Sequence, residues 1–275
     1  IHCGLVGSEM CIRDRRIVCT GGEPWTEKPW KWLFEFIGKS KVPIMNSAGG
    51  TEVSGSILHC CLHRPFKVGS FNAPIPGMSA DILTLDGKKV STDEMGELVM
   101  RKSSIGLTKS LWNDDDRYIK NYWSIIKDFW VHGDLASKDK DGHWFLHGRS
   151  DDTIKVSGKR IGPSELESVI VKSGKAKEVA AVGIPDENKG SKIILSIVLL
   201  ENSEEKESYF ENLVINDLGK SFKPDKIIFV KDLPKTRNMK IMRRVIKSCL
   251  AKEDPGDIST LLNPESVEEI RAHAI

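Results

Sequence analysis

One short segment divides this sequence. Residues 148–152, Gly-Arg-Ser-Asp-Asp, are small, polar and charged, and they lie between two apolar regions. Domain boundaries fall in such segments because few packed side chains cross them. We therefore predict two domains, residues 16–150 and residues 151–275. The total of 275 residues is enough for two hydrophobic cores of ordinary size.

The first domain is expected to begin as an α/β unit. Apolar runs predict strands at residues 17–20 and 42–45, with a helix at residues 25–37 between them that ends at Gly38. The second strand leads into residues 46–52, Asn-Ser-Ala-Gly-Gly-Thr-Glu, which we predict to be a loop. In α/β proteins, a glycine-containing loop after a strand is a usual place for backbone that binds a ligand.

The remainder of the first domain has a β pattern. Residues 66–100 are rich in glycine and proline, and short alternating segments at residues 80–85 and 96–100 indicate a meander of small strands. Residues 129–135 and 144–146 continue this pattern. The expected fold of the first domain is α/β with a β-rich portion.

The second domain is expected to be a compact α+β unit. Ser157-Gly158 separates residues 154–156 from residues 159–161, which indicates a hairpin with a two-residue turn. Pro163 opens a predicted helix that runs to about Val171, since proline is well tolerated in the first turn. The remaining predicted elements are strands at 179–184, 193–200 and 227–230, and helices at 205–218, ending at Gly219, and at 241–251.

Composition narrows the class of protein. A formal net charge of +2 is too small to indicate a nucleic-acid-binding protein. No apolar run reaches the roughly 18 residues that a membrane-spanning helix requires. The six cysteines show no C-x-x-C pair and no regular spacing, which is typical of reduced thiols. We expect a cytoplasmic protein without a nucleic-acid partner or a membrane span.

The start of the chain has no clear pattern of secondary structure. It begins with Ile1 rather than methionine, so we expect the sequence to be incomplete. Residues 5–15 resemble the translated remnant of a sequencing adaptor, and residues 1–15 are interpreted as a non-native leader. The alternative is a genuine segment with little structure.

Six short motifs occur in order along the chain. They are GGEPW (21–25), NSAGGTE (46–52), HGDLA (132–136), GRSDD (148–152), SGKR (157–160) and PKTRNMKIMRR (234–244). Together they resemble the adenylate-forming superfamily of acyl-CoA synthetases, luciferases and adenylation domains, and most of all its acetyl-CoA synthetase branch. The resemblance implies the C-terminal part of the large AMP-binding domain, followed by a small mobile α+β domain.

The resemblance implies an ATP site in the first domain. Asp134 matches the family's ribose-binding aspartate, and one carboxylate can accept from two vicinal hydroxyls. Arg149 matches an arginine that assists at the ribose, and the turn Gly22-Glu23-Pro24 matches a segment beside the adenine. Without the resemblance, Asp134 is interpreted as a turn residue and Arg149 as part of a surface ion pair.

Residues 46–52 imply contacts with the acid and with phosphate. The loop that passes between the adenine and the acyl pocket in the family is matched here by Asn46, Ser47, Ala48, Gly49, Gly50 and Thr51, with Thr51 near the phosphates. Glu52 matches the carboxylate that holds Mg²⁺, a hard cation suited to bridging phosphate oxygens. The alternative for Glu52 is a structural salt bridge.

The resemblance also implies that the second domain moves. In the family this domain rotates about a hinge after the adenylate forms, and Asp151 falls at the hinge position. Lys240 matches the catalytic lysine that approaches the α-phosphate in the first half-reaction. Ser157 and Gly158 match positions near the pantetheine of CoA, and Arg160 matches one near nucleotide phosphate.

Lys240 has a competing interpretation. It belongs to a run of bases with no acid between them, and such runs are usually solvated faces or nucleic-acid patches. The members of this basic run are Lys235, Arg237, Lys240, Arg243, Arg244 and Lys247. Because the run lies inside a matched motif, we favour the phosphate role for Lys240.

Three departures from the family pattern affect the prediction. The acetyl-specific branch has tryptophans where this chain has Ala48 and Gly49, so we expect a pocket for an acid larger than acetate. The catalytic lysine usually follows glycine, but Met239 precedes it here, so the loop is expected to be stiffer or its lysine differently placed. A metal site of some relatives, formed by backbone groups and a histidine, would fall at Val171, Ser173 and Ala176. Serine replaces the histidine, so this site is left open.

His59-Cys60-Cys61-Leu62-His63 suggests a second metal site. If the segment is a strand, His59, Cys61 and His63 share one face, but their spacing matches no common zinc motif. We favour a structural role for these residues, since cysteine often behaves as a small apolar residue in cores.

The implied reaction joins a carboxylic acid to CoA. ATP and the acid give an acyl-adenylate and pyrophosphate, and CoA then gives the thioester and AMP, with Mg²⁺ as cofactor. The family's phosphate loop is absent from these residues, so we expect the chain alone to be inactive. Alternatives are an acetoacetyl-CoA synthetase, an adenylation domain that loads a carrier protein, and a non-catalytic nucleotide-binding regulatory protein.

Overall fold

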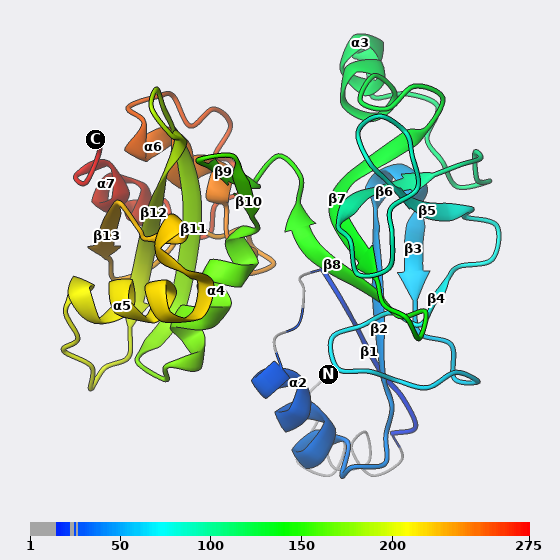
Figure 1. The fold of residues 1–275 in the computed structure, drawn as a ribbon, viewed down its shortest axis with the longest axis horizontal. Coiled ribbons are helices and arrows are strands. Elements are labelled where there is room, and N and C mark those ends of the chain that lie inside the picture. Colours follow the sequence, from blue (N-terminus) through cyan, green and yellow to red (C-terminus); the bar gives the residue numbers. More distant parts are fainter. Residues whose placement is uncertain (1–14, 23–24, 26) are drawn as a thin grey trace, which may run out of the picture. The chain divides into compact units, whose positions relative to one another are not determined.

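The computed structural model describes residues 15–22, 25 and 27–275, which form two compact units that divide between Ser150 and Asp151 and are called unit 1 and unit 2. Both units mix helices with open sheets, in agreement with the predicted fold class (Figure 1). Among the described residues, no helix combines the length and apolarity needed to cross a membrane.

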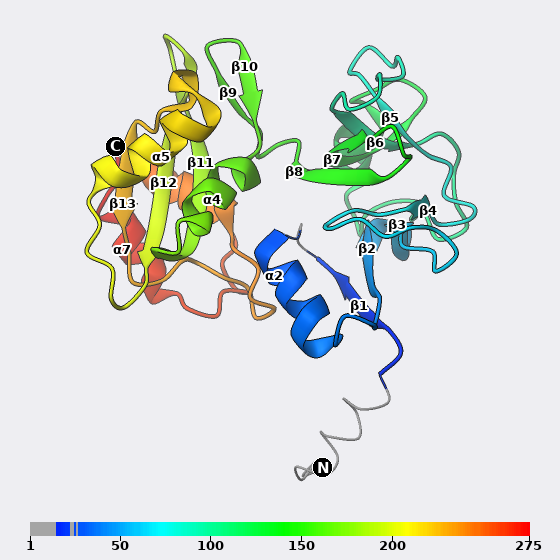
Figure 2. The same ribbon diagram turned by 60° about the horizontal axis from the view of Figure 1, so that its bottom comes forward.

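The first sheet of unit 1 has the strand order β1-β2-β3-β4. Its strands are Val18–Gly21, Ile44–Gly50, Gly55–His59 and Ala73–Pro74. The chain runs from β1 through α2, Glu27–Trp32, into β2, which pairs with β1 in parallel (Figure 2). The predicted helix begins two residues late, and its second half, Leu33–Ile37, is π-helical before it ends at Gly38.

Residues 46–50 form strand rather than loop, which corrects the sequence prediction. Strand β2 continues to Gly50 because residues 47–50 pair with β3, with a bulge between Ala48 and Gly49. A Cβ at position 49 would overlap the carbonyl oxygen of Gly55 and lie 2.5 Å from Cα of Ser56. Glycine is thus needed here for close strand approach, and a short 3₁₀ helix, Thr51–Val53, follows.

The second sheet of unit 1 is antiparallel throughout, with the order β5-β6-β7-β8. The strands are Ala80–Leu83, Gly96–Met100, Trp130–Lys138 and Trp144–Arg149. All five residues of β6 are buried. Between β6 and β7 lie α3, Asp115–Tyr118, and a π-helical turn, Ile119–Trp123, neither of which was predicted.

Unit 2 begins with the predicted hairpin. Strands β9, Ile154–Val156, and β10, Lys159–Ile161, pair around Ser157 and Gly158. Both turn residues have positive φ, 49° and 81°, as a type I′ turn requires. Helix α4, Pro163–Lys172, follows, and Glu165 accepts a hydrogen bond from the backbone N–H of Gly162 at 3.0 Å.

A three-stranded sheet forms the centre of unit 2, in the order β11-β12-β13. Its strands are Ala176–Asp186, Gly190–Leu199 and Lys226–Phe229. The other elements of the unit are α5 (Glu207–Leu218), the 3₁₀ helix Lys220–Phe222, α6 (Arg243–Leu250) and α7 (Glu265–Arg271). Gly219 ends α5 with φ 92°, and α7 lies where no element was predicted.

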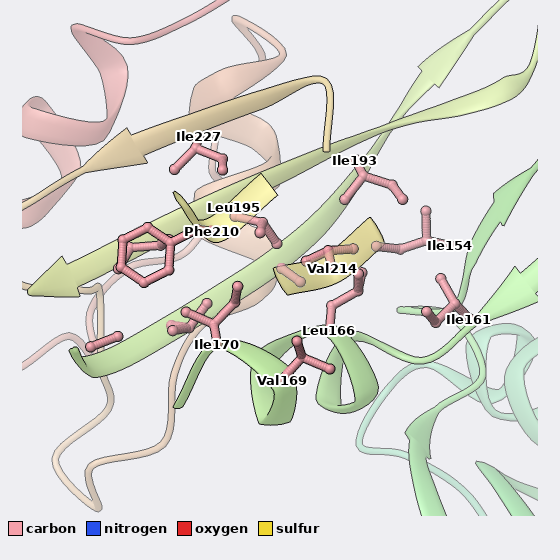
Figure 3. Close-up of a cluster of buried hydrophobic side chains, with 14 of the residues drawn as sticks. Ile154, Ile161, Leu166, Val169, Ile170, Ile193, Leu195, Phe210, Val214 and Ile227 are labelled. Atoms are coloured by element: carbon pink, nitrogen blue, oxygen red, sulfur yellow. The ribbon is translucent and has the colours of Figure 1, made fainter. Parts of the chain in front are cut away.

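Two apolar cores cover the two faces of this sheet. On one face, Leu166 and Ile170 of α4 and Phe210 of α5 pack with Ile193 and other strand residues (Figure 3). On the opposite face, alternate strand residues pack with side chains from α6 and α7. The period-2 alternation along β11 and β12 therefore serves two cores at once. Unit 2 is a helix–sheet–helix sandwich.

Candidate functional site

Asp134 and Arg149 lie opposite each other on β7 and β8. Arg149 Nη1 is 3.7 Å from Asp134 Oδ1 and donates a hydrogen bond to the carbonyl oxygen of His132 at 3.0 Å. Gly133 has φ 83°, and a Cβ there would lie 2.6 Å from Arg149 Nη2. The glycine of the His-Gly-Asp motif therefore makes room for the guanidinium beside the aspartate.

Glu52 lies in the 3₁₀ helix after β2 and accepts a hydrogen bond from the Tyr122 hydroxyl to Oε1, at 3.0 Å. Burial, together with the hydrogen bond to Glu52 and the charge of that carboxylate, raises the pKa of Tyr122 to about 12. The Tyr122 ring stacks on Trp130 of β7, with centroids 5.3 Å apart. Glu52 is thereby anchored against the second sheet.

Gly50 brings Glu52 and His132 together. A Cβ at position 50 would lie 3.1 Å from Glu52 Oε2 and 3.2 Å from His132 Cε1, so both side chains flank this glycine. His132 is 6% exposed, and its Nε2 is 3.2 Å from Asp134 Oδ2. The structure thus gathers Glu52, Asp134 and Arg149 around His132, with Asp134 at the ring and Arg149 at the backbone carbonyl oxygen.

Sequence reasoning missed His132 and Tyr122 as members of this cluster. The signal for His132 was present, because it is the first residue of the His-Gly-Asp motif. Tyr122 gave no local signal, since it contacts Glu52 across 70 positions of sequence, from the π-helical turn that follows α3.

The other predicted residues of unit 1 lie along β1 and β2. Asn46 is buried and accepts a hydrogen bond from Thr20 Oγ1 at 3.1 Å, and Ser47 Oγ donates to the carbonyl oxygen of Thr20 at 3.1 Å. Gly22 follows β1 with φ 105°. Glu23 and Pro24, predicted beside the adenine, lie outside the described residues.

The structure limits the prediction about the acyl pocket. Ala48 packs against the core of unit 1, and the direction of a side chain at Gly49 is occupied by the backbone of β3. The space that a missing indole would leave at position 49 is therefore filled by the neighbouring strand. Thr51, predicted near the phosphates, is exposed at the start of the 3₁₀ helix.

Lys240 is exposed at the end of a tight loop in unit 2. The N–H of Thr236 donates to the carbonyl oxygen of Lys240 at 2.9 Å, and Thr236 Oγ1 accepts from the Lys240 N–H at 3.2 Å. Met239 has φ 63°, the left-handed backbone that favours glycine. Methionine thus adopts the conformation suited to the family's glycine, at a cost of about 1 kcal/mol.

The basic run is not one solvated face. Lys235 is 5% exposed and pairs with Glu178 and Asp232, each at 2.7 Å. Arg243 donates to both carboxylate oxygens of Glu167, at 2.9 and 2.8 Å. Arg244 donates to two backbone carbonyls, whereas Arg237, Lys240 and Lys247 have exposed side chains.

The remaining predicted positions of unit 2 lie at its start, at the β9–β10 hairpin and at the end of α4. Asp151 is its first residue, and Ser157, Gly158 and Arg160 are exposed at the β9–β10 turn. Ser173, at the possible metal site of the small domain, donates from Oγ to the carbonyl oxygen of Ile170 at 2.6 Å and ends α4. Its hydroxyl therefore serves as a helix cap.

The segment from His59 to His63 does not meet the condition for a shared face. Strand β3 ends at His59, and a turn begins at Leu62. Asn72 holds this segment through its side chain, which accepts from the Cys61 N–H and donates to the Cys61 carbonyl oxygen, at 2.5 and 3.0 Å. The segment is a structured turn in which Cys60 is buried.

The fold matches that of solved structures of CoA synthetases and CoA ligases. The structure is similar to acetoacetyl-CoA synthetase from Streptomyces lividans, with a TM-score of 0.80 and 22% identity over 94% of this chain and 40% of that one. An anthranilate CoA ligase in complex with anthranoyl-AMP gives a TM-score of 0.72 and 26% identity, over 85% of this chain and 44% of the ligase.

The sequence comparisons give the family. Residues 10–112 match the AMP-binding enzyme family, and residues 165–240 match the AMP-binding enzyme C-terminal domain. The chain belongs to this family of adenylate-forming enzymes. It is 38% identical over 266 residues to the acetyl-coenzyme A synthetase of Methanothrix thermoacetophila, and 37% over 272 residues to that of Pasteurella multocida. Each alignment covers 94% of this chain and about two fifths of the relative, 40% and 41%.

Proposed function

We propose that this chain is part of an AMP-forming acyl-CoA synthetase. The reaction converts a carboxylic acid and ATP into an acyl-adenylate and pyrophosphate. The CoA thiol then attacks the acyl carbon, which gives the thioester and releases AMP. The observation that carries the proposal is the gathering of Glu52, Asp134 and Arg149, from three separate segments, around His132.

In this proposal Asp134 receives the ribose of ATP. A carboxylate has about four acceptor positions, so the contacts with His132 and Arg149 still leave acceptors for two hydroxyls. The Arg149 side chain is 44% exposed, which places a fixed positive charge at the surface beside this carboxylate. That charge supports binding of an anionic nucleotide at the same place.

Glu52 is proposed to hold Mg²⁺. The residues fit this ion, because Mg²⁺ in proteins is typically bound through one or two carboxylates together with substrate phosphates. The Tyr122 hydroxyl holds Oε1 of Glu52. The other oxygen, Oε2, lies beside Gly50, which has no side chain to cover it. When bound, the ion would neutralise charge on the phosphate oxygens of ATP.

The second unit is proposed to supply the switch between the two half-reactions. Asp151 acts as the hinge and Lys240 stabilises charge at the α-phosphate during adenylation. Ser157 and Gly158 contact CoA, and Arg160 contacts nucleotide phosphate. The exposure of Lys240 and Arg160 supports roles in which these side chains meet a ligand.

The acid is proposed to be larger than acetate. The support is the absence of tryptophan at positions 48 and 49, where the acetyl-specific branch resembled by this chain has indoles. Because β3 occupies the side-chain direction at Gly49, the missing ring leaves no room at that position, and the support rests on Ala48. We expect the 275-residue chain alone to bind nucleotide weakly without turnover, in a cytoplasmic setting.

Calorimetric titration of the chain with ATP and Mg²⁺ tests the nucleotide site. Asp134→Asn is expected to weaken ATP binding by about tenfold, since it weakens charge-assisted hydrogen bonds to the ribose. Glu52→Gln is expected to reduce the dependence of binding on Mg²⁺. Asp86→Asn, which changes an exposed carboxylate paired with Lys88, is the matched control. Equal ATP affinity in Asp134→Asn and Asp86→Asn would contradict the proposal.

A further inference from the structure

His132 is buried at the centre of the cluster, yet the roles proposed above do not use it. Its Nε2 is 3.2 Å from Asp134 Oδ2. Because a carboxylate can only accept, an attractive contact requires a proton on Nε2. Arg149 Nη1 stands 3.7 Å from the other oxygen, Oδ1. The Asp134 carboxylate thus lies between two nitrogen donors, one buried and one partly exposed.

Packing fixes the His132 ring from the sides that do not face Asp134. The ring lies 5.5 Å, between centroids, from Trp130, which in turn stacks on Tyr122. Gly50 lies against Cε1, so a side chain at that position would press on the ring. The backbone is held as well, because the His132 carbonyl oxygen accepts from Arg149.

The second ring nitrogen makes no competing bond. Nδ1 of His132 is buried and has no hydrogen-bond partner within the described part of the chain. Within the residues that the structure describes, the polar contact of the ring is therefore the one with Asp134. A buried polar ring is costly unless it is hydrogen-bonded, so this contact, together with the packing of the ring, orients the imidazole against the carboxylate.

We propose that His132 is a positioning residue for the ribose site. It holds Oδ2 of Asp134 so that the carboxylate presents its remaining acceptors to the 2′- and 3′-hydroxyls of the nucleotide. This inference rests on the function proposed above. It adds a role in recognising the ribose hydroxyls. The imidazole acts through Asp134 and does not itself contact the sugar.

The test compares two ligands that differ only in the ribose. Calorimetry measures binding of AMP and of 2′,3′-dideoxy-AMP to the full 275-residue chain. Hydrogen bonds to a charged group are expected to make AMP bind about tenfold more tightly than the dideoxy compound. In His132→Asn, whose shorter amide does not reach Asp134, this ratio is expected to fall close to one.

Two further variants separate positioning from a general effect on folding. His132→Gln places an amide nitrogen near the position of Nε2 and is expected to retain most of the ratio. His147→Asn changes a half-buried histidine of β8 that contacts Ser137, and it is expected to leave the ratio unchanged. Thermal unfolding of each variant shows which are folded, and the ratio is compared among those.

The affinity ratios of the variants decide between a positioning role and no role for His132. Loss of discrimination in His132→Asn, with retention in His132→Gln and His147→Asn, supports the positioning role. Full discrimination in folded His132→Asn, or equal loss in His147→Asn, overturns it. Failure of the parent chain to prefer AMP over the dideoxy compound contradicts the proposed ribose site, and therefore the proposed function itself.

Discussion

At the scale of single residues, Tyr122 offers a direct test of the Glu52 environment. Its ordinary pKa of 10.0 is raised to about 12 in the folded chain. A raised pKa means that the fold favours the neutral phenol, so this contribution to stability is complete below pH 10 and is lost as the pH rises through 12. Ultraviolet titration of tyrosinate is expected to show a late step that Tyr122→Phe removes. A late step that survives in Tyr122→Phe would contradict the assignment.

Met239 offers a second test at this scale. Its backbone is left-handed, with φ 63°. This conformation is strained for a residue that has a Cβ atom and is not strained for glycine. Met239→Gly is therefore expected to raise the free energy of unfolding by about 1 kcal/mol, measured by urea denaturation. The neighbouring Asn238→Gly, at a residue without positive φ, is the control and is expected to destabilise the chain. Destabilisation of similar size in both variants would show that position 239 is not strained.

At the scale of elements, the β2–β3 pair sets how close the backbone comes to the site. A Cβ at Gly49 would meet the backbone of Gly55 and Ser56, whereas one at Gly50 would meet only the ends of two side chains. Gly49→Ala is expected to lower the free energy of unfolding by about 1–3 kcal/mol, and Gly50→Ala by less. Chemical denaturation measures both. Equal effects would mean that β3 can move away from position 49 at little cost.

One ion pair links three elements of unit 2. Glu167 of α4 accepts from the backbone N–H of Ala181 in β11 and from two nitrogens of Arg243 in α6. Both charged side chains are largely buried, at 13% and 16% exposure. Removing one partner leaves the other charge buried, so Glu167→Ala is expected to cost about 3–5 kcal/mol. A double-mutant cycle with Arg243→Ala measures the coupling, and additive effects would contradict a linked pair.

Elements with strong local signals were predicted well from the sequence. The Ser157-Gly158 turn and the helix opened by Pro163 depend on local backbone chemistry, and both formed as predicted. The conformation of residues 46–50 depends on pairing with β3, so glycine content alone gave the wrong prediction of a loop. The contacts of His132 and Tyr122 with Asp134 and Glu52 depend on tertiary packing, which a motif search does not reveal.

At the scale of the whole molecule, each unit has its own apolar core. Unit 1 is centred on the packing of residues such as Trp130 and Leu98, and unit 2 on the two faces of its three-stranded sheet. The boundary between Ser150 and Asp151 follows Arg149, so the proposed hinge stands two positions from a proposed ribose residue. A substitution at the hinge is therefore expected to alter nucleotide binding.

Coupled formation of AMP and acyl-CoA is the direct test of the proposed synthetase activity. The assay uses this chain joined to the part of the Methanothrix thermoacetophila relative that it does not cover, with acids from acetate to octanoate and acetoacetate. Equal amounts of AMP and acyl-CoA, dependent on CoA and greatest beyond acetate, are expected, and Lys240→Ala is expected to block adenylate formation. Preference for acetate alone would overturn the proposed acid class only. ATP binding without AMP formation from any acid would contradict the proposed synthetase activity.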